Sequence, residues 1–216
     1  MKITILYDNE TKKEELKKDW GFSCIIEGEG GSNLPLIMFD TGADGAILLH
    51  NMKELGIETK DIGIVVISHD HWDHTGGLSA VIKANGDAKI YVPRSFPETN
   101  FEKKTIRVKE IFQIGEDIFS TGELNGIEQS LIIKTNKGIV AVVGCSHSGV
   151  ENILKVASQF GKIYGIVGGF HGFRNYEALN DLSLICPCHC TQYKGEIRSL
   201  FSDRSLECGA GVVISL

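Results

Sequence analysis

Short apolar runs rich in Ile, Val and Phe recur along the chain, and Gly, Asn or Asp bounds most of them, which is a pattern typical of strands. Apolar positions at helical spacing separate some of these runs, as in 46–55, where Ile47, Leu48 and Leu55 share one face and Gly56 follows as a C-cap. The predicted helices are 46–55, 77–84, 150–160 and 193–201. The predicted strands are 2–7, 22–27, 34–39, 62–68, 88–92, 106–114, 130–135, 138–144, 162–167, 182–186 and 211–215.

Hairpin-like successions dominate the middle of the chain, where Asn-Lys-Gly at 136–138 separates two apolar runs, while helices alternate with strands toward each end. This mixture predicts an α/β protein with sheets covered by helices, not one doubly wound parallel sheet. A length of 216 residues without a break in composition predicts a single domain over residues 1–216.

The composition is that of a soluble globular protein, with 42% hydrophobic and 23% charged residues. A net charge of −6 argues against nucleic acid as a partner, because its phosphates attract basic surfaces. The segment 1–8 is too short and polar for a signal peptide, and no stretch is long enough to span a membrane. We therefore expect a cytoplasmic protein with a small-molecule substrate, no membrane partner, and six cysteines present as thiols.

The segment Ser68–Gly77 carries the strongest chemical signal. Three histidines and two aspartates occupy six positions, from His69 to His74, directly after the apolar run 62–67. Imidazole nitrogens and carboxylate oxygens crowded at a strand end are typical ligands of a metal ion. This segment therefore predicts a metal site.

Three further histidines, His147, His171 and His189, each follow an apolar run and sit in or beside a tight turn. Strand ends along one edge of a sheet share a common rim, so we expect these histidines to converge. His50 lies inside a predicted helix and is interpreted as an ordinary surface or packing residue.

Several motifs resemble the metallo-β-lactamase superfamily along nearly the whole chain: Phe39-Asp40-Thr41-Gly42, His69-x-His71-x-Asp73-His74, His147 and His189. Gly144–His147, Gly168–His171, Pro187–Thr191 and the closing Gly209–Ile214 are similar to a branch of small metal-dependent hydrolases that includes an archaeal dihydropterin transferase of methanopterin biosynthesis.

The resemblance implies a metallo-β-lactamase-like αββα sandwich of two mixed β-sheets flanked by helices, with two divalent metal ions at one edge. It implies that His69, His71 and His147 hold the first metal, and that Asp73, His74 and His189 hold the second. It also implies that Asp40 fixes a ligand histidine through the outer N–H of the ring. Zinc suits this nitrogen and oxygen set best, and manganese and iron also suit it.

The chain departs from the superfamily at one position. Most binuclear members carry a bridging aspartate on the strand end that here reads Gly168-Gly169-Phe170-His171. His171 is a candidate replacement ligand of the second metal and equally a candidate catalytic acid or hydrogen-bond donor to substrate, and a third option leaves the bridge to water or substrate. Cys186, Cys188 and Cys190 alternate along an extended segment, which predicts buried thiols on the side opposite His189.

The leading functional prediction is a binuclear metal-dependent hydrolase that uses a metal-bound hydroxide, oriented by Asp73, on an ester, thioester, lactone or phosphoester. The alternative is a metal-dependent transferase that joins a dihydropterin pyrophosphate to an arylamine. Trp72, Phe170, Phe173 and Tyr176 are candidates for a pterin pocket, although packing is the commoner role of such residues. A second alternative is a non-catalytic metal-binding protein. The loops 8–22 and 93–104 are expected to set substrate specificity.

Overall fold

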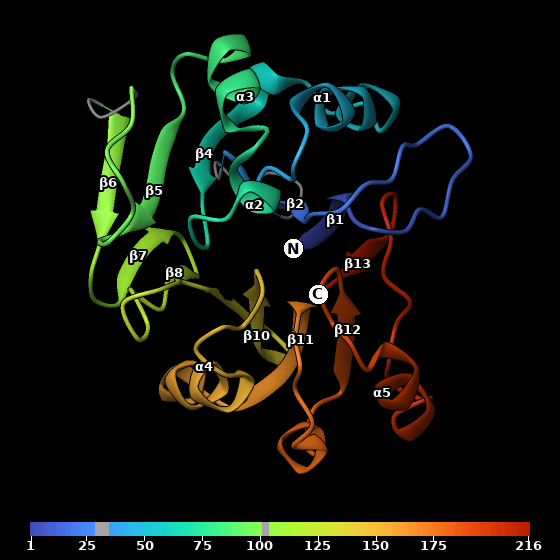
Figure 1. The fold of residues 1–216 in the computed structure, drawn as a ribbon. Coiled ribbons are helices and arrows are strands. Elements are labelled where there is room, and N and C mark those ends of the chain that lie inside the picture. The colour runs from blue at the N-terminus through green and yellow to red at the C-terminus, as the bar shows by residue number, and fades with distance from the viewer. Residues whose placement is uncertain (29–34, 101–103) are drawn as a thin grey trace.

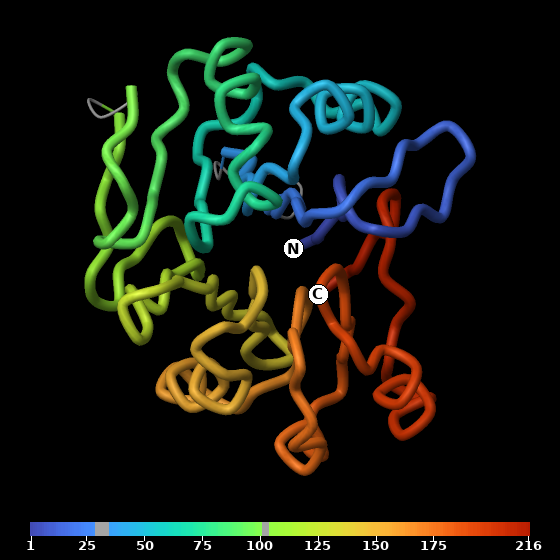
Figure 2. Tube along the Cα trace, viewed as in Figure 1, coloured from blue at the N-terminus to red at the C-terminus, as the bar shows by residue number. Residues whose placement is uncertain are grey.

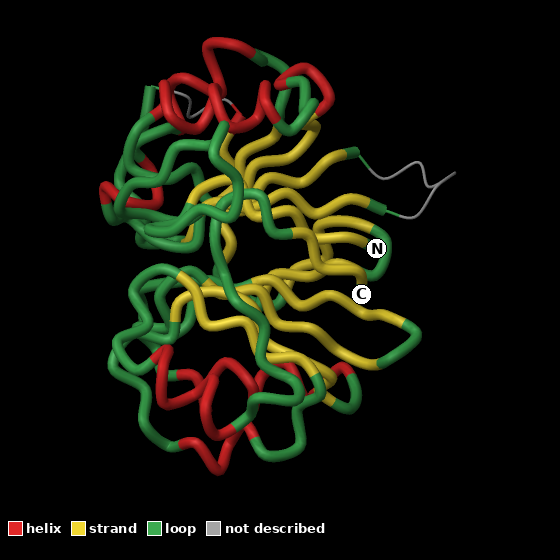
Figure 3. Tube along the Cα trace, turned by 90° about the vertical axis from the view of Figure 1, so that its right-hand side faces the viewer, coloured by secondary structure: helices red, strands yellow, loops and turns green. Residues whose placement is uncertain are grey.

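Two β-sheets face each other, and helices cover the outer face of each (Figures 1 and 3). The computed structural model describes residues 1–28, 35–100 and 104–216. Figure 3 shows the layers in the order helices, sheet, sheet, helices. The αββα architecture of two mixed sheets, expected from the sequence, is thereby confirmed.

The first sheet has seven strands in the order β13-β1-β2-β3-β4-β5-β6. Its strands from β3 to β6 run parallel, whereas β1 pairs antiparallel with both β2 and β13. The strands are β1 Lys2–Tyr7, β2 Ser23–Glu27, β3 Leu36–Phe39, β4 Ile62–Val66, β5 Lys89–Pro93, β6 Thr105–Val108 and β13 Val213–Ser215.

The second sheet has six strands in the order β12-β11-β10-β9-β8-β7. Strands β10, β11 and β12 are parallel neighbours, and the others form antiparallel hairpins. The strands are β7 Phe112–Gly115, β8 Ile118–Ser120, β9 Leu131–Thr135, β10 Gly138–Val143, β11 Ile163–Gly169 and β12 Leu184–Cys188.

Helices α1 and α3 lie over the first sheet, and α4 and α5 lie over the second (Figure 1). Helix α1 begins after Asp44, whose carboxylate accepts from the backbone N–H groups of Ala46 and Ile47 as an N-cap. The helices are α1 Gly45–Glu54, α2 Trp72–Thr75, α3 Leu78–Ala84, α4 Val150–Ala157 and α5 Lys194–Leu200, with 3₁₀ turns at Thr59–Asp61, Ser158–Phe160 and Tyr176–Leu179. In the described ranges no helix is long and apolar enough to cross a membrane.

Strand alternation builds three apolar layers. On β4, Ile64 and Val66 point into the core between the sheets, while Val65 packs under α1 and α3. On β10, Val140 and Val142 point inward, and Ala141 and Val143 pack under α4. Burial of both faces explains why these strands are continuous apolar runs in the sequence.

The predicted strand 106–114 is wrong as one element. The chain forms β6, leaves the first sheet and enters the second as β7, so two short strands replace one (Figure 2). An apolar run crossing from one sheet to another looks in sequence like a single strand, because both halves contact the same core. Strand β8 and the one-turn helix α2 were not predicted, and residue 34 of the predicted strand 34–39 lies outside the described residues.

Candidate metal centre

The candidate ligands sit where parallel strands end. Strand β4 leads through Ser68 into the histidine segment, β10 leads to the turn with His147, and β12 is followed directly by His189. Strand β3, which neighbours β4, ends immediately before Asp40. The carboxyl ends of strands from both sheets therefore deliver side chains to one edge of the sandwich.

The structure brings together the ring nitrogens of His69, His71 and His147, which all lie within 4.8 Å of one another. The Nε2 atom of His69 is 3.0 Å from Nδ1 of His71. The His147 ring centroid lies 4.8 Å from that of His69 and 4.9 Å from that of His71. These are the three side chains expected at the first metal position.

A second group joins Asp73, His74 and His189, again with ligand atoms within 4.8 Å of one another. The Oδ2 atom of Asp73 lies 3.1 Å from Nε2 of His189 and 3.9 Å from Nε2 of His74. All three residues are buried. They are the side chains expected at the second metal position.

An oxygen acceptor orients each of three candidate ligand rings. The Nδ1 atom of His69 lies 2.8 Å from Ser68 Oγ, that of His74 lies 2.7 Å from Asp40 Oδ2, and that of His189 lies 2.9 Å from Asn9 Oδ1. A neutral imidazole carries one N–H proton, and an ionised Asp40 and the other two oxygen atoms favour the tautomer that carries it on Nδ1. The Nε2 lone pair of each ring is thereby directed into the site.

Asp40 is fully buried beneath the site. Its carboxylate accepts from the Ser68 backbone N–H at 2.6 Å, and from the Ser68 hydroxyl at 2.7 Å. Burial raises the pKa of Asp40 to about 8, against hydrogen bonds from Ser68 that lower it. Burial, followed by the mutual repulsion of the histidines, lowers the pKa of His69 and His74, so both rings are neutral near pH 7.

The site fits divalent cations on three counts. The Nε2 atoms of His147 and His189 are buried without a hydrogen-bond partner among the described residues, although buried polar atoms normally have one. Neighbouring nitrogen and oxygen ligands of a tetrahedral zinc ion lie about 3.3–3.6 Å apart, given metal–ligand bonds of about 2.0–2.2 Å. The measured separations of 3.0, 3.1 and 3.9 Å bracket that value. Burial also keeps the His69 and His74 rings neutral, as ligands must be.

Sequence reasoning missed three residues at the site. The indole N–H of Trp20 donates to Asp73 Oδ2 at 2.9 Å, and its ring meets the edge of His189 at 5.1 Å. Asn9 orients His189, and the Cys145 thiol lies 3.2 Å from His74 Nε2. Trp20 and Asn9 belong to the loop 8–22, which was expected to shape the substrate site, but no spacing signal distinguishes them.

His171 is exposed at the rim of the site, with a ring centroid 5.0 Å from that of His147. It joins none of the groups of converging ligand atoms found in the described part of the chain. His171 instead lines a cavity of about 450 Å³ together with His147, Phe173 and Arg174. His50 stands apart from the site, and its Nε2 atom lies 2.9 Å from the Glu15 carbonyl oxygen.

The aromatic candidates have different surroundings. Phe170 is buried in the core under α4 and α5. Phe173 is half-buried and stacks edge-on against Tyr176, with ring centroids 6.2 Å apart. Trp72 is 65% exposed. Among these four aromatic residues, Phe170 and Phe173 line the cavity beside His171.

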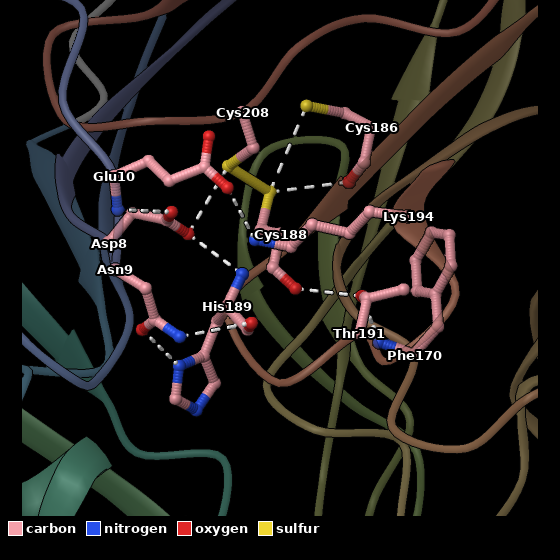
Figure 4. The surroundings of a disulfide bond; sticks show 10 residues. All are labelled: Asp8, Asn9, Glu10, Phe170, Cys186, Cys188, His189, Thr191, Lys194 and Cys208. Atoms are coloured by element: carbon pink, nitrogen blue, oxygen red, sulfur yellow. Dashed lines mark hydrogen bonds and ion pairs between the residues drawn. A yellow bond between two sulfur atoms is a disulfide. The ribbon is translucent and has the colours of Figure 1, made fainter. Parts of the chain in front are cut away.

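A disulfide joins Cys188 to Cys208 directly behind His189 (Figure 4). The expectation that all six cysteines are thiols is therefore wrong for this pair, because the fold brings Cys208 beside β12. The prediction that Cys186, Cys188 and Cys190 share one side is also wrong. The left-handed backbone of His189, with φ 46°, breaks the strand alternation, so Cys190 reaches the Cys145 carbonyl instead.

Two curated relatives come from Methanocaldococcus jannaschii. One is 28% identical over 82% of each chain and is named 7,8-dihydropterin-6-methyl-4-(beta-D-ribofuranosyl)-aminobenzene-5′-phosphate synthase. The other is an uncharacterized protein, 28% identical over 89% of this chain and 91% of its own length.

Solved structures share the fold. Tm1679, described as a metal-dependent hydrolase of the beta-lactamase superfamily, is 27% identical and covers 100% of this chain and 99% of its own, with a TM-score of 0.81. Zinc-bound PqqB from Methylobacterium extorquens is 10% identical, with full coverage of both chains and a TM-score of 0.67, and shows the fold alone.

The comparison with the synthase corrects the leading functional prediction. That relative makes a dihydropterin–aminobenzene conjugate by name, which contradicts hydrolysis as the main prediction and supports the transferase alternative. A cluster of histidines and aspartates specifies where cations bind, but the nucleophile is chosen by the surrounding pocket. The ligand motifs alone could therefore not separate water from an amine.

The family itself follows from the motifs, the fold and a direct match. The model of the metallo-beta-lactamase superfamily matches residues 25–154, a range that includes the histidine segment after β4 and the turn with His147. The chain belongs to the metallo-beta-lactamase superfamily.

Proposed function

We propose that this protein is a metal-dependent transferase that joins a dihydropterin pyrophosphate to an arylamine. The observation that carries the proposal is the similarity to the synthase, which extends over 82% of both chains. The converging ligand groups support it, because a pyrophosphate leaving group needs concentrated positive charge.

In this proposal His69, His71 and His147 hold one divalent cation, and Asp73, His74 and His189 hold a second, with zinc the first choice. Bound cations would neutralise the charge that builds up on the departing pyrophosphate. Asp40, Ser68 and Asn9 keep the protons of the ligand rings on Nδ1.

The reaction forms one bond and breaks one. The arylamine nitrogen attacks the methylene carbon attached to the pterin ring, and the bond from that carbon to the pyrophosphate oxygen breaks with its electron pair. His171, at the rim of the site, accepts the proton that the nitrogen loses. Arg174, in the same cavity, supplies a cation for the anionic part of the substrate.

The test is a two-substrate assay with zinc-loaded protein. Dihydropterin pyrophosphate is incubated with and without 4-(β-D-ribofuranosyl)aminobenzene 5′-phosphate, and the conjugate and free pyrophosphate are quantified by chromatography and mass spectrometry. We expect conjugate and pyrophosphate in equal amounts, and only when both substrates are present. Pyrophosphate released equally fast without the amine would contradict the proposal.

The variant His171→Asn tests the proton acceptor. We expect a fall in turnover of about 10²- to 10⁴-fold, the usual range for loss of a general base, with metal content unchanged. Lys155→Gln, which alters an exposed residue of α4 away from the cavity, is the control. An unchanged rate in His171→Asn would remove His171 from the mechanism.

A further inference from the structure

The strand end that carries the bridging aspartate in most binuclear members of the family has no side chain here. Strand β11 lies between β10 and β12, whose ends deliver His147 and His189, and it ends at Gly169. A Cβ atom on Gly169 would lie 2.4 Å from the Gly144 carbonyl oxygen and 2.6 Å from Cys190 Sγ. The backbone and a thiol therefore occupy the space that a carboxylate from this strand would need.

The Cys145 thiol occupies the region between the two ligand groups. Its Sγ atom forms one cluster with the ligand atoms of His69 and His74, and another with those of His189 and Cys190, each within 4.8 Å. The sulfur therefore lies near ligand atoms of both candidate cation positions. Cys145 is 3% exposed, so its sulfur faces the site rather than solvent.

The Cys145 sulfur lies close to one ligand atom in particular. Sγ of Cys145 lies 3.2 Å from Nε2 of His74, whose other ring nitrogen is already engaged by Asp40. Two ligands of one tetrahedral zinc ion, a nitrogen and a sulfur, lie about 3.5 Å apart. The observed separation of 3.2 Å is close to that value.

We propose that Cys145 is a metal ligand that replaces the bridging aspartate and connects the two cation positions. This inference rests on the metal-binding part of the proposed function. On binding, the sulfur gives up its proton to solvent and forms a thiolate–metal bond, as coordinating thiols do. Cys190 is the weaker candidate, because it clusters with His189 but with no ligand of the first group among the described residues.

The assignment predicts a sulfur signature in the metal-loaded protein. Wild-type protein loaded with two equivalents of Co²⁺ should show a near-ultraviolet thiolate-to-cobalt charge-transfer band, and X-ray absorption of the zinc form should show a zinc–sulfur distance of about 2.3 Å. Cys145→Ser should lose both signals and bind the second equivalent more weakly by more than about 100-fold, the upper range for loss of an outer partner.

Cys190→Ser and Cys24→Ala are the matched controls. Cys190 neighbours the site, and Cys24 is buried on β2 in the core between the sheets. Both should keep the charge-transfer band. If Cys145→Ser does not fold, the wild-type X-ray absorption spectrum together with Cys190→Ser still decides the question, because a metal–sulfur bond that survives Cys190→Ser supports Cys145.

Three results would overturn the inference: two bound metals without any metal–sulfur signal, a signal that persists in Cys145→Ser, or one that disappears only in Cys190→Ser. None of these affects the proposed transferase reaction, which the two-substrate assay tests separately. Conversely, a sulfur signal in a protein that forms no conjugate would uphold Cys145 as a ligand and reject the reaction.

Discussion

Asp40→Asn should weaken metal binding while leaving the metal-free fold nearly unchanged. The carboxylate accepts from His74 Nδ1 and from the Ser68 hydroxyl through the same oxygen, Oδ2. The introduced amide would keep the acceptor for the Ser68 backbone N–H and place an NH₂ group where Oδ2 was. That group donates, so His74 must move its proton from Nδ1 to Nε2, the atom directed at the metal.

The expected cost is that of a hydrogen bond to a charged group, about 1.5–3 kcal/mol. This corresponds to a loss of about 10- to 150-fold in metal affinity, at 1.4 kcal/mol per tenfold. Competition titration with a chromophoric chelator measures the affinity. Asp87→Asn, which removes one exposed carboxylate, is the control and should change affinity by less than about twofold.

Without metal, the same substitution should leave the free energy of unfolding nearly unchanged at pH 7. Burial raises the pKa of Asp40 to about 8, so at pH 7 the metal-free protein holds a neutral carboxyl group that donates to His74 Nδ1 as an amide would, whereas metal binding at Nε2 favours the ionised carboxylate and the Nδ1 proton. The folded state binds this proton more tightly than the unfolded state, so its contribution is complete in acid and is lost as the pH rises to about 8. We expect the stability difference between variant and wild type to move in favour of the variant from about pH 4, the pKa of an unfolded aspartate, to about pH 8, and to stay constant above that.

Urea unfolding in the presence of a chelator measures that difference at each pH. Wild-type zinc affinity in Asp40→Asn would refute the role of Asp40 in setting the His74 tautomer. A metal-free variant destabilised by more than about 3 kcal/mol at pH 7 would refute a neutral Asp40, because a neutral carboxyl group and an amide are close in hydrogen-bonding capacity.

Further predictions test the loop, the packing and the metal. Trp20→Phe should lower metal affinity about tenfold, since Asp73 loses its indole donor, and an unchanged titration would contradict this. Gly76→Ala should cost about 3 kcal/mol or more, because its Cβ would lie 1.9 Å from the Ala43 carbonyl oxygen. Gly195 lies in α5, and a Cβ atom added there would meet no other atom within 4 Å. Gly195→Ala should therefore stabilise the protein by about 0.5–1 kcal/mol. Equal urea midpoints for the two glycine variants would reject the packing argument. Adding zinc to about 100 times its dissociation constant should raise stability by about 2.7 kcal/mol per occupied site over chelator-treated protein in calorimetry.

Local patterns of apolar and polar residues were sufficient to predict most of the helices and strands. The helix 46–55 was predicted within one residue at each end, since its apolar face and its terminal glycine are encoded within one short segment. The run 106–114 was misread, since nothing within it indicates that β6 and β7 belong to different sheets.

Some of the candidate ligands could be predicted from local spacing, whereas the convergence of the others depends on long-range contacts. Within the segment from His69 to His74, the strand end and the single turn of α2 are local, so their spacing alone indicated a metal site. His147 and His189 were indicated because each follows a buried run. Their meeting depends on β10 and β12 both running parallel to β11, which pairing between distant strands decides, and on the packing of the second sheet against the first.

Three features depended on long-range contacts alone. Asn9 meets His189 across 180 positions, Trp20 meets Asp73 across 53, and Cys145 meets His74 across 71. No periodicity or motif records such pairs. The Trp20 pair forms once the strands of the first sheet are assembled, and the Asn9 and Cys145 pairs form only after the two sheets have packed. The residue types in the chain indicated a metal site, whereas the assembly and packing of its two sheets determined which side chains surround the candidate ligands.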